Sequence, residues 1–362
     1  MNLRTLETKV ICSNPDNPFH NYFAWPSVAR LQDGRLMMVT SGLRMKHVCP
    51  FGKVVGCISE DEGKTWTKPA VIIDTPLDDR DAGILPFGEN SVMVTSFNNT
   101  VQAQRNWNAN NQIAYIYAYL DRLEKIGVQK IEDRYLGSTF VVSHDGGRTF
   151  GEVKRMPITS PHGPTLLKDG TILYVGRIFT SNTRKVEHDT LSAYTMTADG
   201  EYEKLCDIEN IAPELLSCEP HTIVLPDGKI IVHIRVQPAR GSDVFTTYQC
   251  ESYDNGRSFT RPHQILSIKG GAPAHLLRLE NGVLISVYGY REMPYGIRMM
   301  YSTDNGETWS TDHVLYAQEV SSDLGYPCSV QLKDGSILTV FYAHPTEKDP
   351  AVIMQIQWTL EV

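Results

Sequence analysis

The sequence predicts an all-β fold, a six-bladed β-propeller that forms one domain over residues 1–362. Three observations predict it: a tight-turn motif that recurs four times, a hairpin motif that recurs six times, and a nearly constant spacing between the hairpins. Repeats of about 40–50 residues are typical of propeller blades, which bury a core only when several stand side by side.

The tight-turn motif has the form S-x-D-x-G-x-[TS]-[WF], called the Asp-box below. Its copies are Ser59–Trp66, Ser143–Phe150, Ser252–Phe259 and Ser302–Trp309. In such a turn the aspartate accepts hydrogen bonds from nearby backbone N–H groups, and the glycine supplies a positive φ. The final aromatic residue is expected to pack between sheets. We therefore interpret the four aspartates as structural.

The hairpin motif is a proline, an alternating stretch, an Asp-Gly or Asn-Gly turn and then an apolar run. From proline to turn glycine, five copies cover Pro26–Gly34, Pro164–Gly170, Pro220–Gly228, Pro273–Gly282 and Pro327–Gly335. A sixth copy without the proline begins at Gly83 and turns at Gly88. Each copy predicts two antiparallel strands joined by a tight turn.

The spacing of the prolines sets the period and the way the ring closes. The intervals are 220 − 164 = 56, 273 − 220 = 53 and 327 − 273 = 54 residues. Only 362 − 327 = 35 residues follow the last proline. We expect the N-terminal strand near Leu6–Cys12 to complete this blade beside Val352–Leu360, because closure removes an exposed sheet edge.

The second blade contains extra residues that predict a short helical insertion, at about residues 105–130. Between Trp107 and Lys130 the apolar residues recur at helical spacing, and Gly127 is a plausible C-terminal stop. We expect this helix to pack against the rim of the propeller. A lid and a dimer contact are the alternatives.

Charge and composition exclude several classes of protein. Lys plus Arg is 34 and Asp plus Glu is 42, so 34 − 42 gives a net charge of −8, which disfavours a nucleic-acid partner. No apolar run approaches the length of about 18 residues that a membrane span needs. No signal peptide is visible, so we expect a cytoplasmic protein, or a secreted or periplasmic one if a leader was trimmed. The oligomeric state is left open.

The cysteines indicate neither a disulfide framework nor a metal site. The chain has seven of them, widely scattered and without a C-x-x-C pair. An odd, scattered set of this kind is typical of reduced, mostly buried thiols. We expect no metal and no cofactor.

Four Asp-boxes within six hairpin repeats resemble the sialidase (neuraminidase) superfamily, also called BNR-repeat proteins, over nearly the whole chain. In that family the starts of the inner strands converge on the active site. The resemblance implies a glycoside hydrolase with a carbohydrate partner, although Asp-boxes also occur in propellers that are not enzymes.

Specific residues match the family's functional segments. Cys218-Glu219-Pro220-His221, followed by Arg235, resembles the segment that carries a catalytic Glu and a substrate-binding Arg. Tyr326 stands where the family has its nucleophilic Tyr, and Arg291 and Arg298 resemble a further anion-binding Arg. A neutral Tyr deprotonated by a Glu suits a sugar with a carboxylate on its anomeric carbon, which would repel a carboxylate nucleophile. Arginines bind such a carboxylate in a bidentate fork.

Two family elements are missing. Trp25 stands where sialidases have an Arg before the first inner-strand proline, and the loop around His47 lacks the family's acid/base Asp. Asp79 or Asp81 could supply the acid/base and Arg80 a substrate clamp. The alternative for residues 78–81 is a solvated loop with an internal ion pair.

Histidines recur at the starts of the inner strands, at His162, His221 and His275, and His47 lies in the loop just described. They could act as acids or bases, or donate hydrogen bonds to sugar hydroxyls. Arg177 ends the inner hairpin of blade three and could face the same cavity. Trp25 could stack on a sugar ring or belong to the core.

The sequence therefore supports three hypotheses about function. The first is an exo-acting hydrolase of the sialidase superfamily that releases a terminal acidic sugar. The second is another carbohydrate-active enzyme on the same scaffold, a uronate- or rhamnose-directed hydrolase or lyase. The third is a propeller that binds a glycan or another partner without catalysis.

Overall fold

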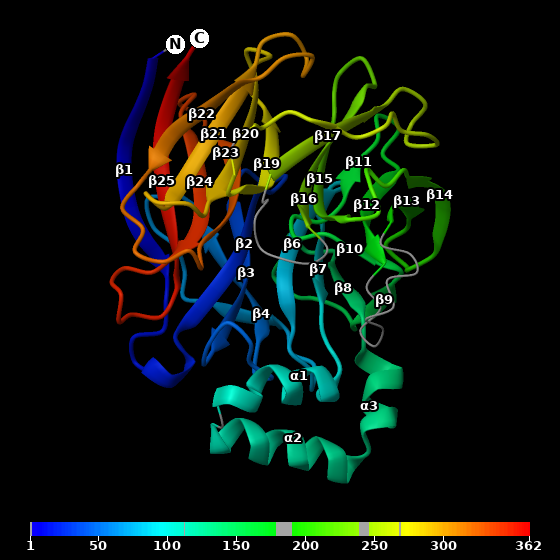
Figure 1. Cartoon of the computed structure of the whole chain (residues 1–362), viewed down its shortest axis with the longest axis vertical. Coiled ribbons are helices and arrows are strands. Elements are labelled where there is room, and N and C mark those ends of the chain that lie inside the picture. The colour runs from blue at the N-terminus through cyan, green and yellow to red at the C-terminus, as the bar shows by residue number, and fades with distance from the viewer. Residues whose placement is uncertain (1, 112, 179–189, 239–245, 268) are drawn as a thin grey trace.

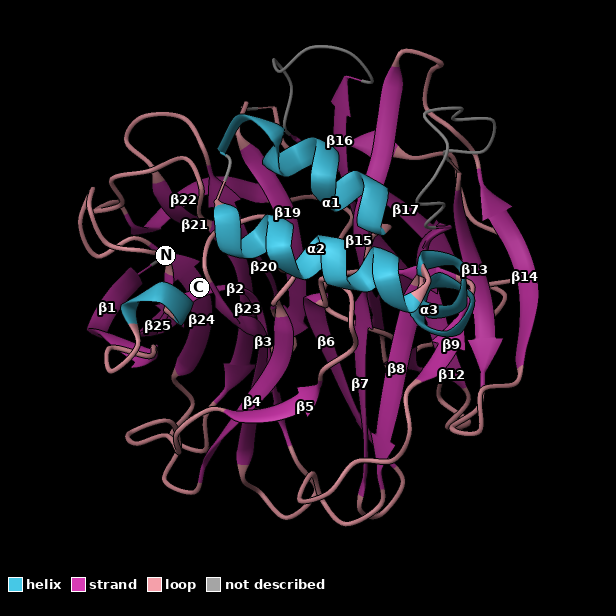
Figure 2. Ribbon diagram, turned by 90° about the horizontal axis from the view of Figure 1, so that it is seen from below, coloured by secondary structure: helices cyan, strands magenta, loops and turns pink. Residues whose placement is uncertain are grey.

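The computed structural model describes residues 2–111, 113–178, 190–238, 246–267 and 269–362. Its strands form six antiparallel sheets arranged in a ring (Figure 1). Figure 2 looks at one face of this ring, with the first strands of the sheets near the middle and the last ones at the periphery. The predicted six-bladed β-propeller is confirmed.

Blades one to three run from residue 22 to residue 208. Blade one contains β2 (Tyr22–Arg30), β3 (Leu36–Arg44), β4 (Lys53–Ser59) and β5 (Ala70–Ile73). Blade two contains β6 (Arg80–Phe87), β7 (Ser91–Phe97), β8 (Ser138–Ser143) and β9 (Lys154–Met156). Blade three contains β10 (Ile158–Thr159), β11 (Thr165–Leu166), β12 (Ile172–Ile178), β13 (Leu191–Met196) and β14 (Tyr202–Ile208).

Blades four to six complete the ring. Blade four contains β15 (Leu215–Val224), β16 (Ile230–Pro238), β17 (Thr246–Ser252) and β18 (His263–Gln264). Blade five contains β19 (Gly271–Arg278), β20 (Leu284–Tyr290), β21 (Gly296–Ser302) and β22 (Ser310–Tyr316). Blade six contains β23 (Gly325–Gln331), β24 (Ile337–Ala343), β25 (Val352–Glu361) and β1 (Asn2–Cys12).

Both ends of the chain lie in blade six. The strand β1 pairs with β25 from Asn2 opposite Glu361 to Cys12 opposite Ile353. The predicted closure by the N-terminal strand is confirmed, and this strand is longer than Leu6–Cys12. The ends of the ring are therefore joined by backbone hydrogen bonds, and blade six does not present β25 as an open edge.

The Asp-boxes form the turns that the motif predicts. In the first one, Asp61 accepts hydrogen bonds from the Thr65 N–H at 2.8 Å and the Thr65 hydroxyl at 2.6 Å, and the Ser59 hydroxyl accepts one from the Gly63 N–H at 2.8 Å. The same bonds recur at Asp145, Asp254 and Asp304. Hydrogen bonds from Thr65 lower the pKa of Asp61 to about 2. The carboxylates of these aspartates are therefore engaged in hydrogen bonds within their own turns.

Each Asp-box also packs against the preceding blade. A Cβ on the box glycine of blade two, four or five would come within 3.0 Å of a side chain from the second strand of the blade before it, such as Ile231 in front of Gly306. Gly63 makes the same approach to Leu338 of blade six. The box therefore needs glycine for two reasons: its positive φ and the close approach of the neighbouring blade.

The insertion in blade two consists of three helices, between β7 and β8. They are α1 (Val101–Asn108), α2 (Ala114–Ile126) and α3 (Val128–Tyr135). The prediction of one helix at about 105–130 was therefore too short at both ends. Gly127 does end α2, with its N–H bonded to the Leu123 carbonyl. No helix among the described residues is long and apolar enough to cross a membrane.

The helices lie on one face of the ring (Figure 2). They leave blade two at the end of β7, and Phe97 there pairs with Arg80 at the start of β6. Their buried side chains, among them Ile116 and Leu120, pack with Leu77 and with Phe51 from blade one. The expected packing against the propeller is thus confirmed, on the face where the inner strands begin.

All seven cysteines are free, and six of them are buried, with Cys206 partly exposed. This agrees with the expected reduced and mostly buried thiols.

The close approach of neighbouring blades makes a testable difference between two glycines. Gly306 and Gly335 have nearly the same φ, +82° and +84°, but a Cβ at Gly306 would lie 2.6 Å from Ile231 whereas a Cβ at Gly335 meets nothing within 4 Å. We expect Gly335→Ala to lower the free energy of unfolding by about 1–2 kcal/mol through backbone strain alone. Gly306→Ala should cost about 1–3 kcal/mol more through overpacking. Urea unfolding measures both, and equal losses would contradict this account.

Candidate active site

A repeated distortion of the inner strands builds the site. Five of the six inner hairpins have a register shift near the start of the first strand, which leaves two residues without partners in the ladder. The residue pairs are Trp25-Pro26, Asp81-Ala82, Glu219-Pro220, Ala272-Pro273 and Tyr326-Pro327. Proline is tolerated there because a bulged residue donates no hydrogen bond to the ladder.

Four of these bulges carry a non-glycine residue with positive φ. The φ values are 57° at Trp25, 45° at Asp81, 48° at Glu219 and 47° at Tyr326. Left-handed backbone is costly for such side chains, by about 1–3 kcal/mol each, and residues held in this way cluster at functional sites. The equivalent position in blade three is Gly163, with φ 84°.

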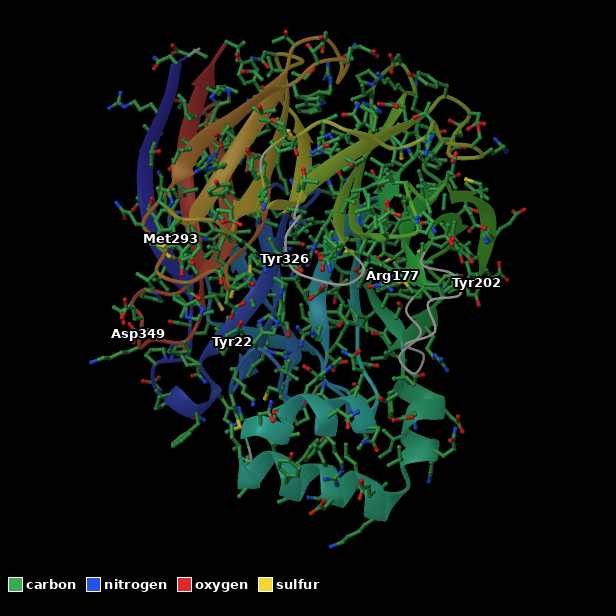
Figure 3. All side chains as sticks on the ribbon, in the orientation of Figure 1. Tyr22, Arg177, Tyr202, Met293, Tyr326 and Asp349 are labelled. Atoms are coloured by element: carbon green, nitrogen blue, oxygen red, sulfur yellow. The ribbon has the colours of Figure 1, made fainter. Side chains whose placement is uncertain are left out.

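Tyr326 and Glu219 form the centre of the site. The Tyr326 hydroxyl donates a hydrogen bond of 2.6 Å to Glu219 Oε1. Tyr326 is only 5% exposed, and in Figure 3 it lies near the middle of the molecule, with Tyr202 and Asp349 toward its edges. The two residues come from blades six and four, so the ring places a phenol and a carboxylate in contact over 107 residues of sequence.

Two arginines flank this pair. Arg235 Nη1 lies 2.5 Å from Glu219 Oε2 and 3.2 Å from the Tyr326 hydroxyl. The Arg291 guanidinium lies over the Tyr326 ring, 5.8 Å from its centroid, and donates a 2.9 Å bond to the Leu324 carbonyl. Both arginines therefore lie beside the Tyr326–Glu219 pair.

Electrostatics keep Tyr326 protonated in the resting site. Burial raises the pKa of Tyr326 well above its ordinary value, the Glu219 carboxylate raises it further, and Arg235 opposes them. Burial alone would lower the pKa of Arg235, but Glu219 raises it above its usual range. Tyr326 therefore holds a proton that Glu219 is placed to accept.

A cavity of about 190 Å³ opens beside Glu219. Its lining combines four charged side chains with smaller polar and apolar groups: Asp81, Phe97, Thr159, Ser160, Pro161, Arg177, Leu216, Cys218, Glu219, Arg235 and Gln237. Of the residues proposed from sequence, Asp81, Arg177, Glu219 and Arg235 meet here. Blades two, three and four all contribute to it, so only the assembled ring creates this space.

The two candidate acids Asp79 and Asp81 have different surroundings. Asp79 is fully buried and accepts hydrogen bonds from the Thr75 N–H at 2.7 Å, the Thr75 hydroxyl at 2.9 Å and the Asn98 amide at 3.3 Å. It holds the loop before β6 and does not line the cavity. Asp81, two residues later, does line it. Burial raises the pKa of each carboxyl to about 7.

Trp25 belongs to the core and offers no face to a sugar. It is 2% exposed and lies against the Arg80 guanidinium at 4.2 Å and the Arg44 guanidinium at 5.0 Å. Its ring centroid is 5.0 Å from that of His47 and 6.4 Å from that of Tyr326. Trp25 thus packs against both His47 and Tyr326.

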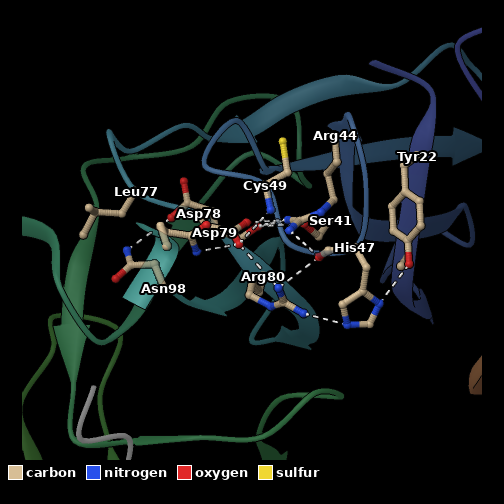
Figure 4. A network of polar contacts seen from close by, with 12 residues as sticks. Tyr22, Ser41, Arg44, His47, Cys49, Leu77, Asp78, Asp79, Arg80 and Asn98 are labelled. Carbon is tan, nitrogen blue, oxygen red and sulfur yellow. Dashed lines mark hydrogen bonds and ion pairs between the residues drawn. The ribbon is translucent and has the colours of Figure 1, made fainter. Parts of the chain in front are cut away.

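His47 belongs to a second polar group, centred on Asp323. Figure 4 shows His47 between Tyr22 and Arg80, which both contact its ring nitrogens. Asp323 lies 2.9 Å from His47 Nδ1 and accepts hydrogen bonds from Tyr22 at 2.7 Å and Tyr342 at 3.0 Å. Burial lowers the pKa of His47, and the nearby Arg80 guanidinium lowers it further against the opposing effect of Asp323. The His47 side chain is 46% exposed, whereas Tyr22 and Tyr342 are buried, so His47 is the solvent-facing member of this group.

A fully buried ion pair between Arg44 and Asp78 lies next to the site. Arg44 Nη1 lies 2.6 Å from Asp78 Oδ1, and both side chains are 0% exposed. Gln104 of α1 donates a 2.9 Å bond to the same carboxylate, and Arg80 lies 3.4 Å from it. The ion pair expected within residues 78–81 is present between Asp78 and Arg80, but it is buried and the loop is not solvated. Asp78 thereby connects Gln104 of the helical insertion to Arg80, which covers the Trp25 ring.

His162, His221 and His275 form a cluster between blades three, four and five. The rings of His221 and His275 stack with centroids 4.2 Å apart, and His162 lies 5.4 Å and 5.0 Å from them. His221 Nδ1 accepts the Leu276 N–H at 2.9 Å. None of the three lines the cavity. Burial lowers all their pKa values, that of His162 to about 3, so they are neutral and tie inner strands together.

The structure separates Arg298 from the site. It lies on β21, pairs with Asp312 and stacks on the Tyr290 ring, with its guanidinium carbon 3.3 Å from the ring centroid. Arg298 does not line the cavity, because β21 is the third strand of its blade and lies away from the centre.

Sequence reasoning missed Asp323, Tyr342 and Gln237. Gln237 accepts two hydrogen bonds from Arg235 and lines the cavity. One pattern could have found Asp323: it precedes Tyr326 by three residues, as Asp78 precedes Asp81. No group of three or more His, Cys, Asp or Glu within the described ranges is arranged to hold a metal ion.

Comparisons with known proteins place the chain among propellers of this type. The sequence model for the BNR repeat-like domain matches residues 122–340. The search of curated proteins found no match. Many solved structures are similar.

A protein of unknown function from Dyadobacter fermentans has a TM-score of 0.77 at 20% identity, with 99% of each chain covered. The leech intramolecular trans-sialidase complexed with 2,7-anhydro-Neu5Ac has a TM-score of 0.66 at 12% identity, covering 98% of this chain and 70% of that one. An α-L-arabinanase from Penicillium chrysogenum complexed with arabinobiose has a TM-score of 0.63 at 13% identity, covering 97% and 98%. At these identities the likeness shows the fold.

The buried Arg44–Asp78 pair predicts a large loss when one partner is removed. We expect Arg44→Met to cost about 3–5 kcal/mol of unfolding free energy, because it leaves Asp78 charged and buried. Arg44→Met combined with Asp78→Leu should recover most of this loss. The exposed pair of Lys204 and Asp207 is the control, and Lys204→Met should cost under about 1 kcal/mol. Denaturant unfolding of these three variants beside the native protein decides, and no recovery in the double variant would refute the pairing.

The neutral histidine cluster predicts acid sensitivity. Below the unfolded pKa of about 6.5, His162 binds a proton in the unfolded chain but stays neutral in the folded protein. The free energy of unfolding therefore falls by about 1.4 kcal/mol per pH unit from this residue until its folded pKa is reached. His162→Gln removes this penalty. The stability advantage of the native protein over His162→Gln should therefore shrink as pH falls from 6.5 to 4. Asp79 and Asp81 act in the opposite sense but are present in both proteins. A difference that stays constant with pH would contradict the assignment.

Proposed function

The chain belongs to the family of proteins with a BNR repeat-like domain, and from that premise we propose that it is a glycoside hydrolase that releases a terminal acidic sugar from a glycan. The observation that carries the proposal is the 2.6 Å hydrogen bond between the Tyr326 hydroxyl and Glu219. A nucleophile and its base within hydrogen-bond reach are the elements that covalent catalysis requires.

Tyr326 is the nucleophile and Glu219 its base. The phenol is neutral until it reacts, so it can approach an anomeric carbon that carries a carboxylate without charge repulsion. As the Tyr326 oxygen attacks, its proton passes to Glu219. Arg235 contacts both groups and stabilises the negative charge that moves between them.

Arginine content favours an anionic substrate. Arg235 and Arg177 line the cavity, and Arg291 covers the Tyr326 ring. A planar guanidinium recognises a carboxylate through two parallel hydrogen bonds. We assign these arginines to the carboxylate of an acidic sugar.

The size of the cavity supports release of a single terminal sugar. Its volume of about 190 Å³ equals roughly six water molecules at about 30 Å³ each. Pockets for larger ligands are typically about 300–1,000 Å³. Thr159, Ser160 and Gln237 in the lining can exchange hydrogen bonds with sugar hydroxyls.

The second candidate is a uronate-directed elimination, and the His47–Asp323 contact favours it. A histidine held by a carboxylate is a suitable base for removing a proton next to a carboxylate group. Trp25 and His47 replace two elements of sialidases, which favours a uronic acid over sialic acid. The solved neighbours include both a trans-sialidase and an arabinanase, so the scaffold supports more than one sugar chemistry.

A panel of aryl glycosides and capped oligosaccharides tests the proposal. We expect release of a terminal acidic sugar, and a loss on the order of 10³-fold or more in kcat/KM for Tyr326→Phe, since the nucleophile is removed. Tyr316→Phe, on the outer strand of blade five, is the matched control and should keep the activity.

Each other outcome points to a different function. Sialoside turnover would identify sialic acid, and uronide turnover a uronic acid. A product with a new double bond conjugated to its carboxylate, detected by ultraviolet absorbance, would replace hydrolysis with elimination. Turnover that survives Tyr326→Phe would refute the nucleophile. Binding of a glycan without turnover would leave a non-catalytic propeller.

A further inference from the structure

We propose that Asp81 is the proton donor of this hydrolysis: its carboxyl group protonates the departing oxygen and then takes a proton from the incoming water. The inference rests on the proposed function, because it assigns a role within the same site. It selects one among the three acid/base candidates, Asp79, Asp81 and His47.

The position of Asp81 is the first argument. Asp81 and Glu219 occupy equivalent bulges of blades two and four, with φ values of 45° and 48°, and both line the cavity. A sugar in this cavity is therefore in reach of the base on one side and of Asp81 on the other. Asp81 is only 6% exposed, so its carboxyl is directed into the cavity rather than toward bulk water.

The freedom of the Asp81 carboxyl is the second argument. Among the hydrogen bonds of the described residues, none uses the side chain of Asp81, and no ion pair does. Asp79 is similarly buried, but both of its carboxylate oxygens accept hydrogen bonds, from Thr75 and Asn98. A carboxyl without fixed partners can donate a proton to a substrate and accept one back, whereas Asp79 would have to break its structural bonds first.

The charge environment is the third argument. Burial raises the pKa of Asp81 to about 7, Arg80 lowers it, Glu219 raises it, and Arg44 and Arg235 lower it. The Asp81 charge also interacts with three phenols, those of Tyr174, Tyr326 and Tyr342. All three are neutral because burial raises their own pKa values. Asp81 therefore keeps its proton at slightly acid pH, as a general acid must.

The two steps balance as follows. The Tyr326 oxygen bonds to the anomeric carbon and gives its proton to Glu219, while the bond from that carbon to the leaving oxygen breaks and the Asp81 proton moves to that oxygen. Water then bonds to the same carbon and gives a proton to the Asp81 carboxylate. The bond to Tyr326 breaks, and Glu219 returns the proton to the phenolate.

His47 fits this role less well. His47 does not line the cavity, and its ring is held by Asp323 at 2.9 Å and packs against the buried Trp25. Burial and Arg80 lower its pKa, so it carries no proton near neutral pH.

The test compares Asp81→Asn, Asp79→Asn and His47→Gln on aryl glycosides whose leaving groups differ in acidity. We expect Asp81→Asn to lose about 10²–10⁴-fold in kcat/KM on poor leaving groups, which need a proton, and far less on dinitrophenolate. The variant should also lose the alkaline limb of the pH profile, where the native acid deprotonates above about pH 7. Asp79→Asn is the matched control, since it should lower stability without any dependence on the leaving group.

Equal losses of Asp81→Asn on all leaving groups, or the leaving-group pattern in His47→Gln, would overturn the inference. Turnover that survives Tyr326→Phe, or no turnover at all, would refute the proposed function instead. In that case carboxyl ¹³C NMR still decides the protonation of Asp81. A titration near pH 7 that disappears in Asp81→Asn supports the protonated state assigned to Asp81, and a titration near its ordinary value overturns the inference.

Discussion

The inner-strand bulge is the constraint on which this site depends. At four blades a non-glycine residue with positive φ interrupts the first hairpin, and the side chains are Trp25, Asp81, Glu219 and Tyr326. A regular strand would alternate its side chains between the two faces of the sheet. The bulge breaks that alternation and re-aims one side chain per blade. The local strain is tolerated because ladder hydrogen bonds resume directly after each bulge.

Closure of the ring turns these separate positions into one site. The Asp-box glycines bring four blades (one, two, four and five) against the preceding one, and β1 completes blade six beside β25. Glu219 and Tyr326 are 107 residues apart in the sequence. Their 2.6 Å contact exists only when blades four and six face the same centre. The histidine cluster packs beside Glu219 through His221 of β15, and the Arg44–Asp78 pair holds the loop that leads into Asp81.

Much of the fold and part of the site could be predicted from the sequence. The Asp-boxes and hairpin prolines are local patterns with a local physical cause, so six blades and the closing strand followed from them. Glu219, Arg235, Arg291 and Tyr326 were implied by the resemblance to sialidase segments, and they do come together. Arg298 was misplaced because a segment match does not say which strand of a blade carries the side chain. Asp323 was missed because a turn residue gains its role only from Tyr22, His47 and Tyr342 around it.

The sequence by itself determined the repeat, the number of blades and the residue types at the bulges. Only the tertiary structure decided which carboxyl is held by hydrogen bonds and which lines the cavity. Asp79 and Asp81 stand two residues apart, and nothing local distinguishes them. One is held by Thr75 and Asn98, and the other faces a cavity that blades three and four also line. The physical reason is that burial and hydrogen-bond partners set the chemistry of a carboxyl group, and here both come from distant parts of the chain.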